Sequence, residues 1–371
     1  MYKINTRTQE NRPLVLSCQK TALIAMSGGV DSSVAAFLMK QTGFLCSGAT
    51  MSLFAGGEKT AEEARIVADR LGIDFHIFDL AEHFTKHVIE PFINDYYKGC
   101  TPNPCVVCNK YLKFGKFLDK ACELGIDHIV TGHYVKIEKD SNGRFLLKKG
   151  NDLLKDQSYV LYSLTQEQLS KVIFPLGDYT KTQVKEIAQN EGLINENKSE
   201  SQDICFIPDG DYMGYINQYT GITPEKGRFV DVNGNFLGES KGISSYTIGQ
   251  RRGLGLSMPH PPYVVEIRPE DNTVVVGKEE MLYSKSLSVK DINLIPYEKL
   301  DKPLKATVKI RYADPGHPAT VRQTDDDMLY IEFDEPQRAI TKGQAAVIYD
   351  GNYVIGGGII TDGNSMITVR S

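Results

Sequence analysis

The pattern of apolar and polar positions changes character along the chain. Between residues 21 and 135, short β-rich runs such as TALIAM and DHIVTGHY alternate with longer stretches that carry apolar residues at helical spacing. This alternation is typical of a parallel sheet with helices on both faces. Two helical stretches end in Leu-Gly-Ile, at 71–73 and 124–126, as a glycine cap before a strand does. We therefore expect a doubly wound α/β domain at residues 21–205.

The sequence downstream of this domain has a different pattern. An Asn-Gly pair in FVDVNGNFLGES lies between two alternating runs and predicts a β-hairpin. Later alternating runs, such as LKATVKIRY and MLYIEF, predict successive antiparallel strands. We expect a small middle domain at 206–262 and a C-terminal antiparallel β-barrel at 263–371. Residues 136–200, which include an Asn-Gly turn, are expected to complete the α/β domain, and residues 1–20 to form a flexible leader.

Composition narrows the class of protein only slightly. The chain has 371 residues, 41% of them hydrophobic and 24% charged, which is ordinary for a soluble globular protein. It has no run of about 20 apolar residues and no secretion-signal pattern, so we expect a cytoplasmic location. Seven cysteines are then expected to be mostly reduced. The net charge of -5 means that RNA would have to be held by a local basic surface.

A glycine loop follows the first predicted strand. In AMSGGVDSSVAAF, Gly28 and Gly29 lie between a buried strand and a helix, with Asp31 and Ser32 in the first turn. Backbone N–H groups at the start of a helix bind anions, so the loop is a candidate phosphate site. The same spacing describes a plain turn in which Asp31 or Ser32 caps the helix. The loop lacks the Gly-Lys-Ser/Thr ending of an NTPase P-loop and the glycine spacing of a dinucleotide fold.

Three cysteines carry the other candidate chemistry. TPNPCVVCNK places Cys105 and Cys108 behind a proline-rich turn, and the pair fits half of a zinc site, a redox pair, or a nucleophile with a neighbour. No second CxxC follows, so a four-cysteine zinc site is poorly supported. Cys205 lies in a short apolar run, and an isolated cysteine of this kind is usually a buried structural residue.

Several motifs in order resemble those of a known family. The run from Ser27 to Ser32, SGGVDS, matches the pyrophosphatase loop of enzymes that split ATP into AMP and pyrophosphate. TPNPxxxCNK, TGHY, KDQSYxLYSL, ICFI, YTIGQRRGLG, RYAD and GQAAVIY follow it, and together they are similar to the tRNA-specific 2-thiouridylases of the MnmA type. The resemblance covers essentially everything after residue 20 and implies an adenine nucleotide α-hydrolase-like fold for the first domain.

The resemblance also implies an activity, that of a tRNA-uridine 2-sulfurtransferase. In that family ATP adenylates the C2 oxygen of the wobble uridine, position 34 of tRNA, and sulfur from a cysteine persulfide replaces this oxygen. By motif, Cys205 carries the persulfide, and Cys108 is the nucleophile that closes a transient disulfide with it. A helix N-terminus at Asn109 is expected to lower the pKa of Cys108. The implied partners are the anticodon loop of tRNA and a persulfide sulfur donor or carrier protein.

The family motifs supply further candidate contacts. The implied ATP contacts are Ala25, Met26, Ser27, Gly28, Gly29, Val30, Asp31, Ser32, Met51 and Gly132. The implied tRNA contacts are Asn103, Pro104, Cys105, His133, Lys155, Asp156, Gln157, Arg311, Tyr312 and Gln344. A carboxylate at Asp31 beside phosphates needs Mg²⁺ or a neighbouring donor to balance its charge, so we expect ATP as its magnesium complex.

One departure from the family and several alternatives complete the predictions. Cys105 stands where the best-known bacterial members have an aspartate, so the acidic role at this position is in doubt. Cys105, Cys108 and Cys205 are together a candidate ligand set for an iron–sulfur cluster with one open iron. The alternative functions are another adenylating pyrophosphatase-loop enzyme, such as an amidotransferase synthetase or a tRNA lysidine synthetase, and a nonenzymatic metal- or RNA-binding module built on CxxC.

Overall fold

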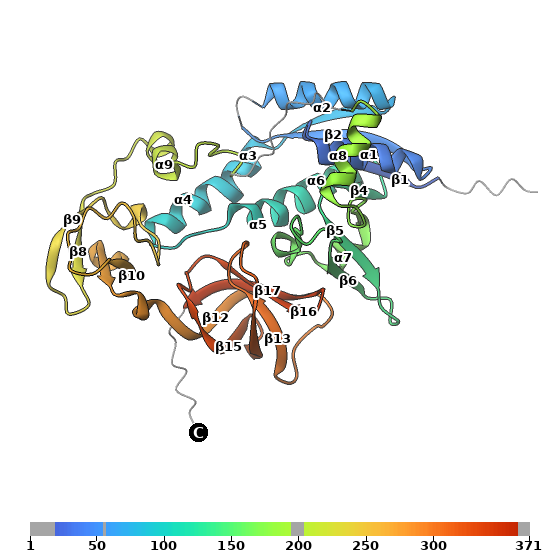
Figure 1. Cartoon of the computed structure of the whole chain (residues 1–371). Helices are drawn as coiled ribbons and strands as arrows, with labels where there is room; N and C mark the ends of the chain where they lie inside the picture. The colour runs from blue at the N-terminus through green and yellow to red at the C-terminus, as the bar shows by residue number, and fades with distance from the viewer. Residues whose placement is uncertain (1–18, 55–56, 194–203, 363–371) are drawn as a thin grey trace, which may run out of the picture.

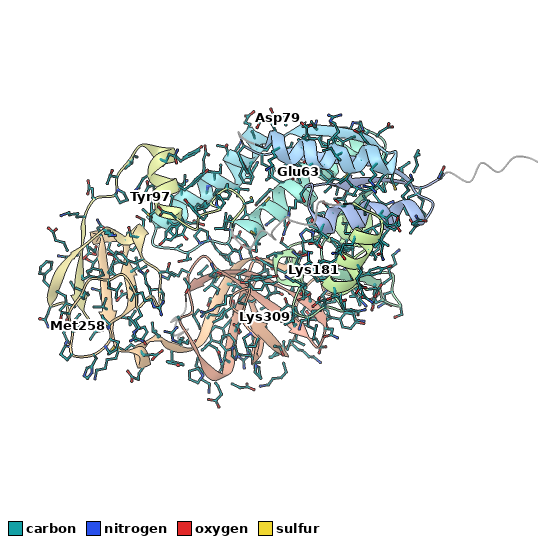
Figure 2. The ribbon with its side chains drawn as sticks, turned by 45° about the horizontal axis from the view of Figure 1, so that its top comes forward. Glu63, Asp79, Tyr97, Lys181, Met258 and Lys309 are labelled. Carbon is teal, nitrogen blue, oxygen red and sulfur yellow. The ribbon has the colours of Figure 1, made fainter. Side chains whose placement is uncertain are left out.

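The computed structural model describes residues 19–54, 57–193 and 204–362, which form three domains (Figure 1). The α/β domain and the C-terminal β-barrel lie against each other, and the middle domain lies at one end of both (Figures 1 and 2). In Figure 2, Lys181 marks the α/β domain, Lys309 the barrel and Met258 the middle domain. The leader predicted at residues 1–20 lies almost wholly outside the described residues.

The α/β domain is built on a five-stranded sheet of order β3-β2-β1-β4-β7. Every neighbouring pair in this sheet is parallel, which confirms the doubly wound fold predicted from the alternating pattern. Strand β1 lies in the middle, where the order of the strands reverses, and ligands of open α/β sheets bind at such a point. The strands are β1 (Thr21–Ala25), β2 (Leu45–Ser52), β3 (Asp74–Asp79), β4 (His128–Val130) and β7 (Val172–Ile173).

Alternate residues of β1 pack into two different cores. Leu23 belongs to a cluster that includes Phe114 and Phe117, from the helical run after residue 103. Ala22 and Ile24 belong to the cluster on the opposite face, because side chains alternate along a strand. That face is covered by α1 (Val30–Gln41), α2 (Glu58–Leu71) and α8 (Lys181–Asn190).

The remaining helices of this domain contain two π-helical segments. The first run is α3 (Ala81–Phe84), η1 (Thr85–Ile89) and α4 (Glu90–Tyr97). The second is α5 (Pro104–Cys108), η2 (Asn109–Lys116) and α6 (Phe117–Glu123). The short elements η3 (Ser158–Leu161) and α7 (Gln166–Lys171) follow. None of the helices in the described part of the chain combines the length and hydropathy that a membrane crossing demands.

The middle domain is larger than predicted. Its sheet has the order β10-β11-β8-β9, with β8 (Gly227–Asp231) and β9 (Phe236–Ser240) forming the predicted Asn-Gly hairpin. Strands β10 (Tyr263–Arg268) and β11 (Thr273–Gly277) join this sheet through the β11–β8 pairing, whereas the sequence prediction began the barrel at 263. An alternating pattern identifies a strand but does not name the sheet that it joins. Helix α9 (Tyr212–Thr220) precedes the sheet.

The C-terminal domain is a closed antiparallel barrel. Its six strands have the order β12-β15-β14-β13-β16-β17, and the β12–β17 pairing closes it. The hairpin of β5 (Val135–Lys139) and β6 (Phe145–Lys149), which was expected to complete the α/β domain, instead pairs with β17. The barrel strands are β12 (Tyr283–Leu294), β13 (Leu304–Lys309), β14 (His317–Asp325), β15 (Met328–Arg338), β16 (Ala345–Asp350) and β17 (Tyr353–Asp362).

Candidate active site

The loop after β1 has the geometry of a tight glycine turn. Gly28 has a φ of +63°, and a Cβ there would lie 2.7 Å from the Cβ of Glu63, so only glycine fits. Gly29 is the N-cap residue of α1 and makes no side-chain capping bond. Ser32 Oγ donates instead to the Gly29 carbonyl at 3.0 Å. Asp31 and Ser32 therefore do not cap the helix, contrary to the plain-turn alternative.

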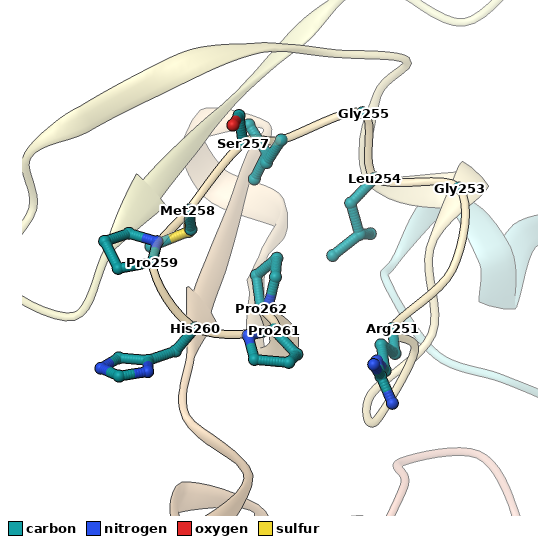
Figure 3. A pocket seen from close by; sticks show the side chains of 11 residues that line it. Arg251, Gly253, Leu254, Gly255, Ser257, Met258, Pro259, His260, Pro261 and Pro262 are labelled. Carbon is teal, nitrogen blue, oxygen red and sulfur yellow. The ribbon is translucent and has the colours of Figure 1, made fainter.

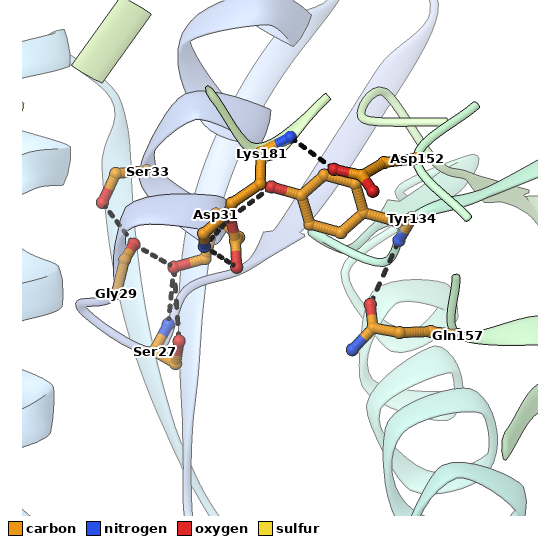
Figure 4. Close-up of polar contacts among 9 residues, drawn as sticks. Ser27, Gly29, Asp31, Ser33, Tyr134, Asp152, Gln157 and Lys181 are labelled. Atoms are coloured by element: carbon orange, nitrogen blue, oxygen red, sulfur yellow. Dashed lines mark hydrogen bonds and ion pairs between the residues drawn. The ribbon is translucent and has the colours of Figure 1, made fainter. Parts of the chain in front are cut away.

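The carboxylate of Asp31 is balanced by two donors from distant segments (Figure 4). Lys181 Nζ lies 2.7 Å from Oδ1 and 2.9 Å from Oδ2 of Asp31. The Tyr134 hydroxyl donates to Oδ1 at 2.7 Å. The Lys181 side chain is 11% exposed and that of Asp31 is 35% exposed, so the pair is partly shielded from water. A carboxylate beside phosphates was expected to need either Mg²⁺ or a neighbouring donor. Lys181 and Tyr134 are such donors.

The sequence prediction did not name Lys181 or Tyr134 as site residues. A signal for Lys181 was present, because Thr180 and Gln183 form a capping box that starts α8 at Lys181. The backbone N–H of Lys181 also donates to Asp152 Oδ2 at 2.9 Å, which fixes the start of the helix. Nothing in the sequence indicated that this helix begins beside the glycine loop.

Gly132 and Met51 lie at the carboxyl ends of strands beside β1. A Cβ on Gly132 would lie 2.9 Å from the carbonyl carbon of Asp31, so glycine allows the loop after β4 to approach the loop after β1. Met51 lines a cavity of about 230 Å³ together with Thr50, Arg65 and other residues of β2 and α2. Ala25 ends β1 directly before the loop, and the contacts of Ala25, Met51 and Gly132 with a nucleotide stay predictions.

The segments of Cys108 and Cys205 converge on one apolar cluster. Cys108 is the last residue of α5, is 8% exposed and packs in a cluster with Phe84 and Phe206. Phe206 is itself 8% exposed and contacts Phe84 with ring centroids 5.5 Å apart. Cys205 is exposed, so it is not the buried structural cysteine of the simplest interpretation. Its buried neighbour Phe206 anchors the segment, and the thiol is left at the surface.

Burial and one lysine set the ionisation of the thiols. Burial raises the pKa of Cys108 to about 12, and although Lys113 lowers it, the effect of burial is larger. Cys105 and Cys205 are exposed at the surface, but nearby protein atoms still remove part of the water around each thiol, which raises the pKa of both, and the Lys113 ammonium opposes the rise. The Cys205 thiol also acts to raise the pKa of Cys108. The three thiols therefore lie within electrostatic range of one ammonium group.

The prediction that a helix N-terminus at Asn109 lowers the pKa of Cys108 is wrong. The helix begins five residues earlier, at Pro104, and Asn103 is its N-cap: Asn103 Oδ1 accepts the backbone N–H of Cys105 at 3.1 Å. Proline favours the first helical position, because it lacks the N–H that would be unpaired there. Cys108 lies at the other end of α5, where the chain continues as a π-helical turn of the kind often found at functional sites.

Several predicted tRNA contacts already have partners within the protein. His133 is 7% exposed, its Nδ1 lies 2.7 Å from Thr131 Oγ1, and burial keeps its pKa well below the usual value. Asp156 Oδ2 accepts the Ser158 hydroxyl at 2.7 Å. Gln157 Oε1 accepts the backbone N–H of Tyr134 at 3.1 Å. These side chains therefore shape the loops around the site, and their contact with tRNA stays a prediction.

Two of the three candidates in the barrel reach the α/β domain. The Tyr312 hydroxyl donates to the Asp156 carbonyl at 3.2 Å, whereas Arg311 donates within the barrel, to the Arg338 carbonyl at 2.8 Å. Gln344 Nε2 donates to the Thr101 carbonyl at 2.7 Å. The candidate contacts from the two domains thus meet beside the segment that leads to α5.

A second cavity lies in the middle domain, at the basic turn after Gln250 (Figure 3). It has a volume of about 450 Å³ and is lined by residues 251 and 253–262. Arg251 and His260 are its charged or titratable side chains, and three prolines form part of its rim. The cavity is separate from the glycine loop, which belongs to the α/β domain.

Metal ligands are sparse at both sites. Over residues 19–54, 57–193 and 204–362, no three His, Cys, Asp or Glu side chains are grouped so as to hold a metal ion. Cys105, Cys108 and Cys205 therefore do not form the ligand set of the predicted iron–sulfur alternative in this conformation. Asp31 is a single carboxylate already paired with Lys181, so it fits a magnesium ion brought by a nucleotide better than one held by the protein.

The parallel sheet, its strand order and the glycine loop after β1 define the class, a nucleotide-binding α/β domain joined to a β-barrel. Residues 20–209 match the family described as tRNA methyl transferase HUP domain. Residues 214–278 match the tRNA methyl transferase PRC-barrel domain, and 284–360 the aminomethyltransferase beta-barrel domain. The match over residues 214–278 includes β10 and β11, so it also assigns these strands to the middle domain.

Curated relatives give the family. The chain is 48% identical over 353 residues to the tRNA-specific 2-thiouridylase MnmA of Clostridioides difficile strain 630, covering 92% of this chain and 98% of that protein. It is 48% identical over 352 residues to tRNA-specific 2-thiouridylase MnmA 1 of Caldanaerobacter subterraneus subsp. tengcongensis, covering 91% and 97%. The chain belongs to the tRNA-specific 2-thiouridylase family, as the motifs predicted.

Solved structures give a weaker likeness. A 4-thiouridine synthetase–RNA complex with bound ATP matches with a TM-score of 0.34 and 19% identity, over 52% of this chain and 46% of that one. A predicted subunit of tRNA methyltransferase from Methanocaldococcus jannaschii matches with a TM-score of 0.33 and 15% identity, over 54% and 87%.

Removing Lys181 tests the ion pair at the glycine loop. We expect Lys181→Met to lower the free energy of unfolding by about 1–3 kcal/mol, because Asp31 loses its cation while half-shielded from water. The measurement is urea unfolding. Lys171→Met, which removes an exposed ion pair to Glu167, is the control and should cost about 0–1 kcal/mol. Equal losses in both variants would contradict a special role for Lys181.

The pKa of Cys108 predicts an unusual pH profile. Alkylation requires the thiolate, so the rate at Cys108, whose pKa is raised to about 12, should still be rising at about pH 11, whereas the rate at an ordinary thiol levels off at about pH 9. In the folded state the Cys108 thiol keeps a proton that it loses above about pH 8.5 in the unfolded state. The stabilising contribution of the neutral thiol is therefore present at neutral pH and lost as pH rises towards the folded pKa. A plateau of the alkylation rate near pH 9, measured by mass spectrometry, would contradict this.

Proposed function

We propose that the protein is an ATP-dependent tRNA-uridine 2-sulfurtransferase that thiolates the wobble uridine. The observation that carries the proposal is the convergence of the Cys108 and Cys205 segments in one apolar cluster within electrostatic range of Lys113. Sulfur transfer between two cysteines needs both thiols beside one substrate atom. Cys108 and Cys205 are far apart in the sequence, so only the fold can bring their segments together. The curated relatives carry the name tRNA-specific 2-thiouridylase, which supports the same activity.

The nucleotide step belongs to the glycine loop. The backbone of the loop and the start of α1 suit the phosphates of ATP, because a helix N-terminus and a positive-φ glycine favour an anion. The C2 oxygen of uridine attacks the α-phosphorus, pyrophosphate leaves, and the base carries AMP at C2. Magnesium, when bound with ATP, would neutralise charge on the leaving pyrophosphate. Lys181 forms an ion pair with Asp31, and in the proposed reaction its ammonium also interacts with a phosphate of the bound ATP.

The sulfur step belongs to the cysteines. The terminal sulfur of a Cys205 persulfide attacks C2, the bond to the AMP oxygen breaks, and the base is joined to Cys205 through two sulfurs. The Cys108 thiolate then attacks the Cys205 sulfur, which forms a Cys108–Cys205 disulfide and releases the 2-thiouridine. A thiol reductant must supply two electrons before the next turnover, and a persulfide donor must reload Cys205.

Cys108 must lose its proton during this sequence. At rest its burial favours the neutral thiol, which protects it from unspecific oxidation. Lys113 is the cation placed to favour the thiolate of all three cysteines. His133 is held neutral by burial, so it can accept or donate one hydrogen bond but adds no charge. The six cysteines in the described residues are free thiols.

The proposed route uses no iron–sulfur cluster. The described thiols do not form a group able to hold a metal, and a two-cysteine route leaves Cys105 without an essential role. We propose that Cys105 contacts the target uridine, because it is exposed near the start of α5 and within electrostatic range of Tyr312.

Cysteine variants test the proposed function. We expect Cys108→Ser and Cys205→Ser each to lower 2-thiouridine formation by at least roughly a hundredfold, because serine can neither carry nor attack a sulfane sulfur. The measurement is mass spectrometry of wobble nucleosides after reaction with tRNA, ATP and a persulfide donor. ATP–pyrophosphate exchange in the presence of tRNA should persist in both variants, since adenylation precedes the sulfur step.

Cys122→Ser is the matched control, because Cys122 is exposed on α6 and has no assigned chemistry. It should keep full activity. Retention of activity in the Cys108 and Cys205 variants would contradict the proposal, and loss of exchange in every variant would point to misfolding. Cys105→Ser should lose less than the two essential variants, and iron and sulfide should be absent from active protein.

A further inference from the structure

The segment Cys100–Asn103, here called the clasp segment, joins the end of α4 to the start of α5 and lies against the barrel. The backbone N–H of Thr101 donates to the Lys342 carbonyl at 2.8 Å. The Thr101 carbonyl accepts from Gln344 Nε2 at 2.7 Å. Both backbone groups of Thr101 are therefore bound by one short loop of the barrel, 341–344, about 240 residues further along the chain.

The barrel loop is shaped for this close approach. Gly343 has a φ of +89°, a region that favours glycine. A Cβ on Gly343 would lie 3.1 Å from both Cys100 Cβ and the Thr101 nitrogen, so a side chain there would press on the clasp segment. Glycine at position 343 therefore lets the barrel loop come close enough to the clasp segment for both backbone hydrogen bonds of Thr101 to form.

The middle domain holds the same segment from another side. Thr101 Oγ1 lies 3.2 Å from Thr247 Oγ1. A Cβ on Gly99, whose φ is +68°, would lie 2.5 Å from Cγ2 of Ile267 on β10. All three domains therefore meet at residues 99–101, and contacts from two of them fix the path of the chain just before α5.

The path from Thr101 to the nucleophile is short and stiff. Pro102 and Pro104 restrict the backbone, and Asn103 caps the helix through the backbone N–H of Cys105 at 3.1 Å. Cys108 lies four residues into the helix that starts at Pro104. A displacement of Thr101 is therefore transmitted to the Cys108 thiol without a flexible linker to absorb it.

We propose that Gln344 is a positioning residue that holds the Cys108 helix in place through the Thr101 carbonyl. This inference rests on the proposed function and deepens it, because it assigns the barrel a part in the sulfur step. The family resemblance gave Gln344 as a tRNA contact. Its amide nitrogen instead donates to the Thr101 carbonyl within the protein. Loss of the Gln344 side chain should therefore change the position and reactivity of the Cys108 thiol even without tRNA.

The test is the Gln344→Ala variant. The alkylation rate of Cys108 is measured without tRNA, and 2-thiouridine formation is measured with tRNA. Loss of one hydrogen bond should loosen the clasp segment and raise the alkylation rate of Cys108 about three- to tenfold in the tRNA-free protein. Single-turnover 2-thiouridine formation at saturating tRNA should fall by a similar factor, while the Kd for tRNA stays within twofold. Fragment-ion mass spectrometry separates Cys108 from Cys105. Gln344→Lys, which retains an N–H donor, should restore both rates.

Gln323→Ala is the matched control, since Gln323 is a barrel glutamine whose amide donates locally, to the Asp325 carbonyl at 3.1 Å. It should change neither rate. Thr101→Val removes the hydroxyl contact to Thr247 and keeps both backbone bonds, and should give a smaller change in the same direction as Gln344→Ala. If Gln344→Ala weakens tRNA binding and leaves Cys108 alkylation unchanged, Gln344 is a tRNA contact and the inference is overturned. Activity of Cys108→Ser would instead refute the proposed function.

Discussion

One apolar core shared by the α/β domain and the barrel is the constraint on which the other features depend. Leu23 of the parallel sheet and Phe114 of the second helical run belong to the same buried cluster as Val347 and Tyr349 of the barrel. The β5–β6 hairpin adds Leu147 to this cluster and pairs with β17. Domains joined by a continuous core do not move independently, so a barrel loop can hold a constant position relative to residues of the α/β domain.

The two halves of the site handle charge in opposite ways. At the glycine loop, the side chain of Asp31 forms an ion pair with Lys181, so the partner cation is part of the protein. At the thiols, burial outweighs the attraction of Lys113, so Cys108 rests in its neutral form. Neither half therefore holds an uncompensated buried charge before its substrates bind. In the proposed reaction, Cys108 loses its proton only at the step in which its thiolate attacks the Cys205 sulfur.

The sequence predicted what is local and missed what is distant. The strand–glycine–helix unit around Gly28 was predicted, because a positive-φ turn needs glycine and the flanking pattern is periodic. The pairing of Asp31 with Lys181 spans 150 residues, and no local pattern records it. Strand β10 was recognised as a strand but placed in the wrong sheet, since alternation shows burial on one face and not the identity of the partner. The high pKa of Cys108 depends on neighbours that only the fold assembles.

The nucleophile helix is also tied to the barrel at its far end. Directly after Cys108, the side chain of Asn109 is buried, and its Nδ2 donates to the Val160 carbonyl at 3.1 Å. The adjacent Tyr159 donates its hydroxyl to the Ala345 carbonyl at 2.8 Å, next to the barrel loop that holds the clasp segment. Both ends of α5 thus lead to the same stretch of the barrel. A helix held at both of its ends keeps the Cys108 thiol in a fixed position relative to the barrel, so the barrel contributes to the geometry of the cysteine exchange although it supplies neither cysteine.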